Sequence, residues 1–456
     1  MNRISMISLG CPKNQVDAER MLALLDAEGF VIGDIYDGVD AVIINTCGFI
    51  DAAKEEAIEN ILDMAQLKEE GLVGKIIVTG CLAERHKEEI LSEIPEVDAV
   101  VGIGANGSIA EIVKSIIGRE SGEIPANEAK GENAYCCFPA KEALPITGTR
   151  MLTTPEYWSY LKIAEGCSNR CSYCVIPYIR GNYRSVPMET LIEEASALAA
   201  EGTKELILIA QDTTNYGIDL YGELALPKLL NELCKIEGIE WIRMLYCYPD
   251  KITDELLEVM ANQPKVLNYF DLPLQHADDK ILKAMNRRGT GEENRQLIKK
   301  IREKLPDAII RTTFIVGYPG EGEEEFENLV EFVNEIEFDR LGCFAFSPQE
   351  GTPAFDAEGQ VDEQTKVDRG EIIMRDQLEI TAIRNHERIA TVCRVLVEEF
   401  DPYTDSYSGR TYMDAPEIDG KIDFTTDLEY NVGDFAEVRI IGINDYDLIG
   451  RDVLCP

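Results

Sequence analysis

Short apolar runs alternate with amphipathic stretches from the start of the chain to about residue 118. The apolar runs predict strands, and the stretches with apolar residues at helical spacing predict helices. The predicted strands are Ile4–Leu9, Val31–Tyr36, Ala41–Asn45, Lys75–Thr79 and Ala99–Ile103, and the predicted helices are Gln15–Glu28, Asp51–Leu67, Glu84–Glu93 and Ser108–Ile117. This alternation predicts an α/β domain over residues 1–118, with an open, mostly parallel sheet.

The periodicity is lost over residues 119–150, where Gly, Pro and polar residues gather. Such a composition is typical of a linker. The segment contains the adjacent pair Cys136 and Cys137, whose side chains would point apart and chelate a metal poorly, so we assign them no role. Cys234, Cys247, Cys343, Cys393 and Cys455 lie among apolar runs, which indicates packing residues.

A second α/β series occupies residues 151–387. Its predicted strands are Tyr160–Ala164, Glu205–Ala210, Trp241–Tyr246, Phe270–Leu274, Ile309–Val316 and Leu341–Phe346, and helices such as Glu189–Ala200, Thr253–Gln263, Gly291–Leu305 and Glu323–Ile336 lie between them. Six such units over about 200 residues suit an incomplete parallel barrel, whose functional residues lie on loops after the strands. Residues 362–390 predict a long charged helix that leaves the barrel.

From Thr391 onward the pattern changes to short β-branched runs broken by turns. The predicted strands are Thr391–Glu398, Tyr407–Met413, Lys421–Phe424, Ala436–Ile441 and Asp447–Leu454. They predict a small all-β barrel over residues 388–456. The fold class is therefore α/β, with an open parallel sheet, a partial (β/α) barrel and a terminal β-barrel.

The composition, 45% hydrophobic and 28% charged over 456 residues, is that of a globular protein of two or three domains. The first residues lack the apolar run and cleavage pattern of a signal peptide, and no span approaches the roughly 20 apolar residues of a membrane helix. Thirteen cysteines without an export signal indicate a reducing compartment and metal ligation rather than disulfides. We expect a cytoplasmic protein without a membrane partner.

The chain is strongly acidic, with 44 basic and 84 acidic residues and a formal charge of −40. Such a field repels nucleic-acid phosphates and attracts basic partners, although many acidic enzymes use their charge only for solubility. Residues 391–456 hold fifteen acidic and five basic residues, a net charge of −10. The terminal β-barrel therefore shares the acidic character of the chain.

Three cysteines, Cys167, Cys171 and Cys174, are packed into eight residues. Cysteines this close rarely reach disulfide geometry without strain, and the chain has only three histidines, none near this segment, to complete a zinc site. Thiolates so spaced can bind one iron–sulfur cluster, where a cubane normally takes four protein ligands. Three thiolates leave one iron open to substrate or cofactor.

Three further cysteines, Cys11, Cys47 and Cys81, each follow a predicted strand of the first domain and lie beside a glycine. The carboxyl ends of parallel strands line the edge of a sheet where ligands bind, so these cysteines can converge in space. A lone cysteine in such a place would be an ordinary small hydrophobe. Three at equivalent positions predict a second three-thiolate cluster site.

The spacing Cys-x3-Cys-x2-Cys, with Tyr173 before its third cysteine, resembles the radical S-adenosylmethionine (SAM) enzymes. With the second three-cysteine set and the terminal barrel, the whole chain resembles the methylthiotransferases of that superfamily. This resemblance implies an N-terminal methylthiotransferase domain, a radical SAM core and a C-terminal TRAM domain.

Two branches of these methylthiotransferases differ in substrate. The motifs SLGCPKNQVDAE, INTCGFIDAAKEEAI, PLQHADDKILKAMNRRGT and TTFIVGYPGE are similar to the RimO family, which modifies an aspartate of a ribosomal protein. The branch that modifies an adenosine in transfer RNA typically has a YGCQMN-like first motif. Pro12-Lys13-Asn14 and Gly48-Phe49-Ile50 side with the protein modifiers.

The resemblance implies two [4Fe-4S] clusters and SAM as cofactors. Cys167, Cys171 and Cys174 would hold the cluster that cleaves SAM, with Tyr173 beside the adenine, and Cys11, Cys47 and Cys81 would hold the auxiliary cluster. The radical formed from SAM would take a hydrogen from the β-carbon of the aspartate. A methylthio group held at the auxiliary cluster, its methyl supplied by a second SAM, would then be transferred.

Other residues after the barrel strands are candidate contacts to SAM or, for Gln275 and His276, to SAM or the substrate, against the alternative of ordinary loop chemistry. They are Gln211, Asp212, Gln275, His276, Gly317 and Glu321. Arg287 and Arg288 are candidates to pair with the substrate carboxylate, and they equally suit the solvated face of a helix. No side chain beyond the cysteine ligands is assigned a catalytic role.

Three functional hypotheses follow. The leading one is methylthiolation of an aspartate in ribosomal protein S-twelve, either free or in the small subunit, with an external electron donor. The second is methylthiolation of a modified adenosine in transfer RNA, which the acidic terminal barrel disfavours because an RNA-binding barrel presents Lys, Arg and stacking aromatics. The third is a two-cluster electron carrier, although carriers usually ligate each cluster fully. We expect no specific nucleic-acid binding.

Overall fold

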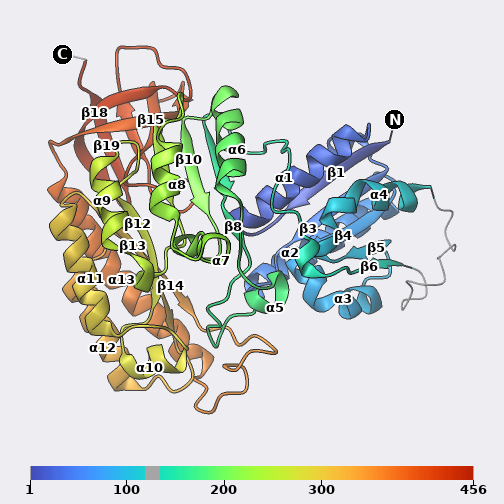
Figure 1. The fold of residues 1–456 in the computed structure, drawn as a ribbon, viewed down its shortest axis with the longest axis horizontal. Helices are drawn as coiled ribbons and strands as arrows, with labels where there is room; N and C mark the ends of the chain where they lie inside the picture. The colour runs from blue at the N-terminus through green and yellow to red at the C-terminus, as the bar shows by residue number, and fades with distance from the viewer. Residues whose placement is uncertain (1, 119–133, 455–456) are drawn as a thin grey trace. The chain divides into compact units, whose positions relative to one another are not determined.

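The computed structural model describes residues 2–118 and 134–454 (Figure 1). It divides into two compact units. The first comprises Met1–Thr154, Ala164–Ser168 and Cys174–Val186, and the second comprises Pro155–Ile163, Asn169–Tyr173 and Pro187–Pro456. In the described part of the chain, no helix combines the length and apolar character needed to cross a membrane.

The first unit is built on a parallel sheet with the strand order β2-β1-β3-β4-β5-β6. Its strands are β1 (Arg3–Ser8), β2 (Val31–Ile32), β3 (Ala41–Thr46), β4 (Ile76–Gly80), β5 (Ala99–Val101) and β6 (Tyr135–Cys137). Every residue of β3 and β4 is buried, because helices cover both faces of the sheet. The predicted open parallel sheet is confirmed.

Four helices supply the two covering layers. They are α1 (Pro12–Ala27), α2 (Asp51–Glu69), α3 (Cys81–Glu93) and α4 (Ile109–Ile117). The apolar residues of α1 and α4 pack together on one face of the sheet, and those of α2 and α3 pack on the other. In Figure 1 this layered sheet is the blue and cyan part of the ribbon.

Two predictions for this unit were wrong in detail. The predicted strand Val31–Tyr36 pairs only over two residues, because the carboxylate of Asp34 accepts the Tyr36 N–H at 2.9 Å and closes a tight turn at Ile35–Asp37. The predicted linker contains β6, which pairs with β5, and therefore Cys136 and Cys137 belong to the sheet. An edge strand of three residues has too little alternation to be recognised from sequence. Residues 119–133 and Cys455 lie outside the described residues.

The second unit contains the six predicted strands of the partial barrel as two parallel three-stranded sheets, β7-β10-β11 and β12-β13-β14. Their bounds are β7 (Trp158–Lys162), β10 (Glu205–Ile209), β11 (Trp241–Met244), β12 (Tyr269–Gln275), β13 (Ile309–Val316) and β14 (Arg340–Ala345). Across the break between the sheets, the Cys247 N–H donates to the Asp271 carbonyl at 2.9 Å. The two sheets therefore continue one another.

Helices alternate with these strands, as predicted. They are α6 (Met188–Ala200), α7 (Ile218–Tyr221), α8 (Leu226–Leu233), α9 (Asp254–Asn262), α10 (Asp279–Ala284), α11 (Gly291–Lys304), α12 (Glu323–Ile336) and the long α13 (Glu363–Glu387). The observed bounds of α12 match the prediction from sequence. Its three glutamates in the first turn favour a helix start there.

The chain ends in a closed antiparallel-rich barrel with the strand order β15-β16-β17-β19-β18, as predicted. Its strands are β15 (Val392–Asp401), β16 (Ser406–Thr411), β17 (Ile422–Thr425), β18 (Phe435–Asn444) and β19 (Asp447–Asp452). Alternate residues such as Val395, Val438 and Leu448 are buried inside it. Closure leaves no free sheet edge.

Buried ion pairs join the terminal barrel to the parallel strands. Arg410 of β16 pairs with Glu205 at 2.8 Å, and Arg340 pairs with Asp414 at 2.7 Å. Glu205 and Arg340 are the first residues of β10 and β14, so these contacts are made at the amino ends of the strands. The carboxyl ends, where loops carry function in such folds, are at the other end of the sheets.

Candidate functional site

The local three-cysteine loop lies between two short strands of the first unit, β8 (Ala164–Glu165) and β9 (Arg184–Ser185), which pair antiparallel. Near its start, the Cys167 N–H donates to the Gly181 carbonyl at 3.1 Å. Near its end, the Tyr183 N–H donates to the Ser168 hydroxyl at 3.1 Å. These two hydrogen bonds therefore hold together the two ends of the loop that carries the cysteines.

The middle of the same loop is anchored by its non-cysteine residues. Asn169 donates to the Asp212 carboxylate at 2.8 Å. The Ser172 hydroxyl donates to the Ala284 carbonyl at 2.8 Å and lies 2.7 Å from the Tyr318 hydroxyl. These contacts reach loops after β10, β12 and β13, so Cys171 is held among the carboxyl ends of the strands.

Tyr173, which the resemblance places beside the adenine of SAM, packs against a small apolar cluster. The cluster contains Ile281, Met285, Tyr318, Phe346 and Ala354. The ring of Tyr173 is only partly buried against it. This surrounding is apolar and contains the aromatic rings of Tyr318 and Phe346, which suits a flat ligand.

The predicted SAM contacts Gln211, Gln275 and Gly317 stand at the carboxyl ends of β10, β12 and β13. The structure thus brings them to one end of the two parallel sheets, where the Cys171 segment also lies. Asp212 is buried, and its carboxylate accepts from Asn169 and Thr214 and pairs with Lys251. Its contacts are protein groups that hold the cysteine loop.

Glu321 is likewise occupied by protein donors. Its carboxylate accepts the Gly317 N–H at 2.9 Å, pairs with Arg369 at 2.8 Å and lies 3.2 Å from Nε2 of His276. Nδ1 of His276 accepts the Asp278 N–H at 3.0 Å, so Nε2 carries the proton that is donated to Glu321. Glu321 and His276 thereby hold the Gly317 loop in place, and the assignment of these residues to SAM stays a prediction.

The second three-cysteine set comes from three neighbouring strands of the first unit. Cys11, Cys47 and Cys81 lie in the segments after β1, β3 and β4, with Cys11 capping α1 and Cys81 opening α3. They form no disulfide. The sheet order therefore brings together cysteines that have 35 and 33 residues between them in the chain.

Two glycines allow these segments to approach closely. A Cβ on Gly10, which has φ +87°, would lie 2.5 Å from Cβ and 2.8 Å from Sγ of Cys47. A Cβ on Gly48 would lie 2.8 Å from the backbone nitrogen of Leu82, next to Cys81. The three cysteine-bearing segments are thus in van der Waals contact, and only glycine fits at these points.

Asn14 and Asn45 lock the same segments. The Asn14 amide donates to the carbonyls of Leu9 at 2.8 Å and Asn45 at 3.1 Å, and the Asn45 amide donates to the Asn14 carbonyl at 2.8 Å. Sequence reasoning used Asn14 only as part of a family motif. Its signal, an asparagine three residues after a strand-end cysteine, is compatible with many loops.

A buried cation, Arg180, lies at this site and was missed from the sequence. It is the last residue of α5 (Ile176–Arg180), a helix that begins two residues after Cys174. Its guanidinium pairs with Asp17 at 2.8 Å and Glu165 at 3.0 Å, and it donates to the Asn14 side chain at 3.2 Å. Its positive charge also acts to lower the pKa of the Cys81 thiol, against the larger effect of burial. Val175 and Ile179, which precede Arg180 in the same segment, pack against Cys81.

The three thiols differ in electrostatic surroundings. Burial raises the pKa of Cys81 to about 12, and burial together with Cys11 raises the pKa of Cys47. Burial also acts on Cys11, but the positive charges of Lys13 and Arg180 outweigh it and lower the pKa of that thiol. Burial therefore disfavours the free thiolate at Cys47 and Cys81, and bound metal ions would stabilise it.

The donor chemistry of both sets fits an iron–sulfur group, because thiolates are the ligands that such clusters take. In the described ranges, no three His, Cys, Asp or Glu side chains form a ready site for a single metal ion. A four-iron cluster is larger than one ion, so its ligands stand further apart. Ligation by the six cysteines stays a prediction.

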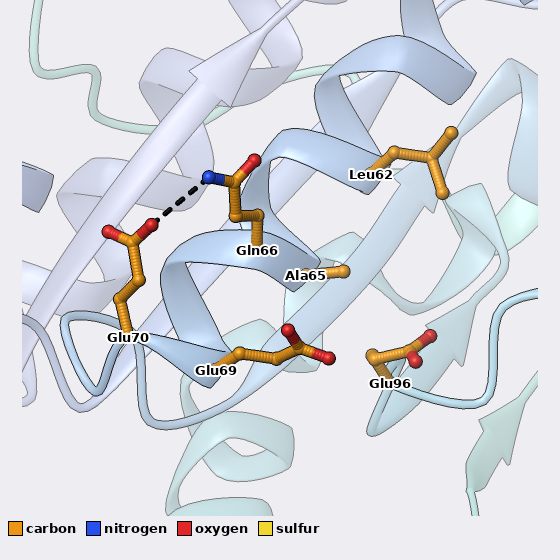
Figure 2. A pocket seen from close by; sticks show the side chains of 6 residues that line it. All are labelled: Leu62, Ala65, Gln66, Glu69, Glu70 and Glu96. Carbon is orange, nitrogen blue, oxygen red and sulfur yellow. Dashed lines mark hydrogen bonds between the residues drawn. The ribbon is translucent and has the colours of Figure 1, made fainter.

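A hollow of about 530 Å³ lies elsewhere in the first unit (Figure 2). It is formed by the last turns of α2 and by Glu96, which lies in the loop between α3 and β5. Figure 2 shows the Gln66 side chain donating to Glu70, and Glu69 and Glu96 at the rim. No cysteine lines it, and Cys47 is at the opposite end of α2. This acidic hollow contributes nothing to the cysteine sites.

Three family models match the chain. The radical SAM superfamily matches residues 161–333, the TRAM domain matches residues 389–453, and an uncharacterised protein family (UPF0004) matches residues 3–102. The radical SAM match runs from the end of β7 through β13, the TRAM match covers the closed terminal barrel, and the third match covers strands β1 to β5 with the second cysteine set. A separate family model thus matches each of the three regions.

Relatives that match over nearly the whole chain share one name. The ribosomal protein uS12 methylthiotransferase RimO of Acetivibrio thermocellus is 47% identical over 98% of both chains. The RimO protein of Clostridioides difficile is 46% identical over 100% of this chain and 99% of its own. The chain belongs to the RimO family. The RimO resemblance of its motifs is confirmed.

Solved structures show the same fold at low identity. The radical SAM methyltransferase TsrM from Kitasatospora setae, with tryptophan and a SAM analogue bound, gives a TM-score of 0.59 at 15% identity, covering 78% of this chain and 75% of its own. The radical SAM enzyme OxsB, with aqua-cobalamin and SAM bound, gives 0.52 at 13% identity, covering 82% and 56%. At this identity the likeness to both structures concerns the fold alone.

Membership of the RimO family makes this chain a radical SAM methylthiotransferase. The electron-carrier hypothesis is thereby excluded. The relatives also disfavour the transfer-RNA hypothesis, because those at 45–47% identity are named for the ribosomal protein.

Proposed function

We propose that this RimO chain methylthiolates the β-carbon of an aspartate in ribosomal protein uS12. The observation that carries the proposal is the 47% identity to a uS12 methylthiotransferase over 98% of both chains. Two three-cysteine sets at the carboxyl ends of parallel strands support it, because the reaction needs one centre to open SAM and another to supply sulfur.

Cys167, Cys171 and Cys174 would hold the SAM-cleaving cluster, and Cys11, Cys47 and Cys81 would hold the auxiliary one. When bound, SAM and the two clusters supply radical cleavage of SAM, hydrogen removal from carbon and a methylthio group whose methyl comes from a second SAM. The protein orients these groups and excludes water from them.

The residues around the first set orient it. Asn169, Asp212 and Lys251 form one partly buried polar group, and Ser172, Tyr318 and the Ala284 carbonyl form another. Each fixes the cysteine loop against a different strand end. Gly317, whose N–H donates to Glu321, precedes Tyr318 and is the backbone that we propose to lie near the adenine.

The terminal barrel supplies a surface for a basic partner. Of its five basic residues, Arg410 is buried in ion pairs, Arg394 pairs with Glu240, and Lys421 pairs with Asp423. These three cations are paired with carboxylates and form no basic patch, and the net charge over residues 391–456 is −10. A basic ribosomal protein, met in the cytoplasm either free or in the small subunit, suits this surface.

The reaction is tested by mass spectrometry of uS12 incubated with anaerobically reconstituted protein, SAM and a chemical reductant that replaces the external electron donor. We expect the mass increase of one methylthio group on an aspartate. The variant with Cys167, Cys171 and Cys174 changed to Ala is the control and should give no product. Modification of transfer RNA, with uS12 unchanged, would overturn the proposal.

The choice of partner is tested by binding at two ionic strengths. The full chain should bind uS12 with an affinity and an association rate that fall as salt rises, because attraction between opposite charges is screened. It should bind transfer RNA weakly, since few cations are available to displace counterions from RNA. Tighter binding to transfer RNA than to uS12 would contradict the assignment.

A further inference from the structure

Arg287 and Arg288 are adjacent in sequence, follow α10 and have different surroundings. The Arg288 side chain is 64% exposed, and its guanidinium lies 3.4 Å from the Asp250 carboxylate. Arg287 turns inward to the segment that carries Cys171. Nothing in the sequence distinguishes the two arginines, so the difference between their surroundings is a property of the fold.

Three contacts fix the guanidinium of Arg287. Nη2 donates to the Pro273 carbonyl at 2.6 Å, the central carbon lies 3.9 Å above the ring of Tyr248, and Nη1 donates to Sγ of Cys171 at 3.9 Å. A planar guanidinium can stack on an aromatic ring and donate in its own plane at the same time. A side chain held on three sides in this way has one orientation.

Tyr248 supports the same sulfur. The residue is buried, and its backbone N–H donates to the Thr214 hydroxyl at 2.9 Å, which fixes its position. Its hydroxyl lies 3.9 Å from Sγ of Cys171. At this distance the hydroxyl is placed to donate to the sulfur when the sulfur is a thiolate.

The charge of Arg287 is not neutralised locally. Within the described residues it forms no ion pair with a carboxylate, and its neighbours are Tyr173, Tyr248 and Cys171. A guanidinium stays protonated in proteins, whatever surrounds it. A permanent positive charge thus lies at hydrogen-bond distance from a proposed cluster ligand.

We propose that Arg287, stacked on Tyr248, is a positioning residue that donates to Cys171 and makes the cluster bound there easier to reduce. The inference rests on the proposed function, in which Cys171 is a ligand. Reduction adds one electron, and a cation with a second hydrogen-bond donor at the same sulfur stabilises that added negative charge. Arg287 therefore acts on the cluster through its ligand, and it is removed from the candidates for the substrate carboxylate.

The test is a redox titration of the reconstituted full-length protein, followed by the electron paramagnetic resonance of the reduced cluster. The variant lacking Cys11, Cys47 and Cys81 identifies which signal belongs to Cys171. Arg287→Gln removes the charge and should make reduction about tenfold less favourable at a fixed potential, or about 59 mV for one electron. Arg288→Gln is the matched control and should leave the potential unchanged.

Two milder variants keep the test decisive if Arg287→Gln folds poorly, as judged by circular dichroism and iron content. Arg287→Lys keeps the charge without the planar fork, and Tyr248→Phe removes only the hydroxyl, so each should lower the potential less than Arg287→Gln. An unchanged potential in an iron-loaded Arg287→Gln protein, or in both milder variants, would overturn the inference. Iron retained at this site in Cys171→Ala would instead show that the proposed ligand assignment has failed.

Discussion

Cys11, Cys47 and Cys81 are brought together by three adjacent strands of a sheet, whereas Cys167, Cys171 and Cys174 come from one loop. In the first set, two thiols are buried and the segments touch through Gly10 and Gly48. In the second, all three cysteines are partly exposed, and the loop is held by side chains between them. The positions of Cys11, Cys47 and Cys81 therefore depend on the whole sheet. The positions of Cys167, Cys171 and Cys174 depend on the side chains that hold their loop.

The arginines at the two sites, Arg180 and Arg287, differ in whether a carboxylate neutralises them. Arg180 is buried and pairs with both Asp17 and Glu165, so the local group has no excess positive charge. Arg287 lies on an aromatic ring with no carboxylate partner in the described chain. The first arginine holds segments together, and the second is available to stabilise an added electron.

The largest expected effect comes from removing one cysteine set at a time. Protein with both sites loaded should hold about eight irons, as two four-iron clusters. Changing Cys11, Cys47 and Cys81 to Ala should leave about half the iron and intact SAM cleavage, but no sulfur transfer. Iron analysis, 5′-deoxyadenosine formation and mass spectrometry of uS12 measure the three. Methylthiolated product from this variant would refute the division of roles.

The reciprocal change, Cys167, Cys171 and Cys174 to Ala, should also leave about half the iron, but it should abolish SAM cleavage. Loss of all iron, or of none, in a folded protein would show that the six cysteines are wrongly divided between the two sites.

Arg180→Met should destabilise the first unit by about 3–5 kcal/mol, because Asp17 and Glu165 would stay buried without their cation. Hydrogen exchange of amides in β3 and β4 of the apo protein measures the loss. The triple variant that adds Asp17→Asn and Glu165→Gln should recover most of it, since no buried charge is then unpaired. A loss below about 1 kcal/mol in Arg180→Met would contradict the enclosed character of this site.

Gly10→Ala should displace Cys47, because the new Cβ would overlap its Cβ and Sγ. We expect a cost of about 1–3 kcal/mol and selective loss of iron from the first set. Gly71→Ala is the matched control: it has a similar positive φ of +80°, but no atom lies within 4 Å of the new Cβ. Equal iron content in the two variants would mean that the contact with Cys47 is unimportant.

Ser172→Ala should have the smallest effect, about 1 kcal/mol, because one hydrogen bond to the Ala284 carbonyl is lost while Tyr318 still donates to that carbonyl at 3.0 Å. Local hydrogen exchange around residues 169–173 measures it. Ser196→Ala, which removes a similar bond on the exposed face of α6, is the control and should leave that segment unchanged. An equal change in both variants would show that Ser172 does not anchor the loop.

Elements with strong periodicity were predictable. The bounds of β13 and α12 match the sequence pattern, because eight residues of alternating burial and fourteen residues of helical spacing each contain enough repeats to define a period. The positions of the cysteines after strands were also predictable, since they follow from where the strands end. Short elements such as β2 and β6 were not, because two or three residues define no period.

The sequence by itself determined the kinds of element, the two cysteine sets and the charge of each domain, all of which depend on local pattern or composition. Only the tertiary structure decided that Arg180 meets Asp17 and Glu165, and that Arg287 turns inward while Arg288 stays exposed. The physical reason is that the partner of a polar side chain is set by packing between elements far apart in sequence. Neighbouring arginines have the same local pattern, and only the groups around them give one a buried contact with sulfur and the other a contact with water.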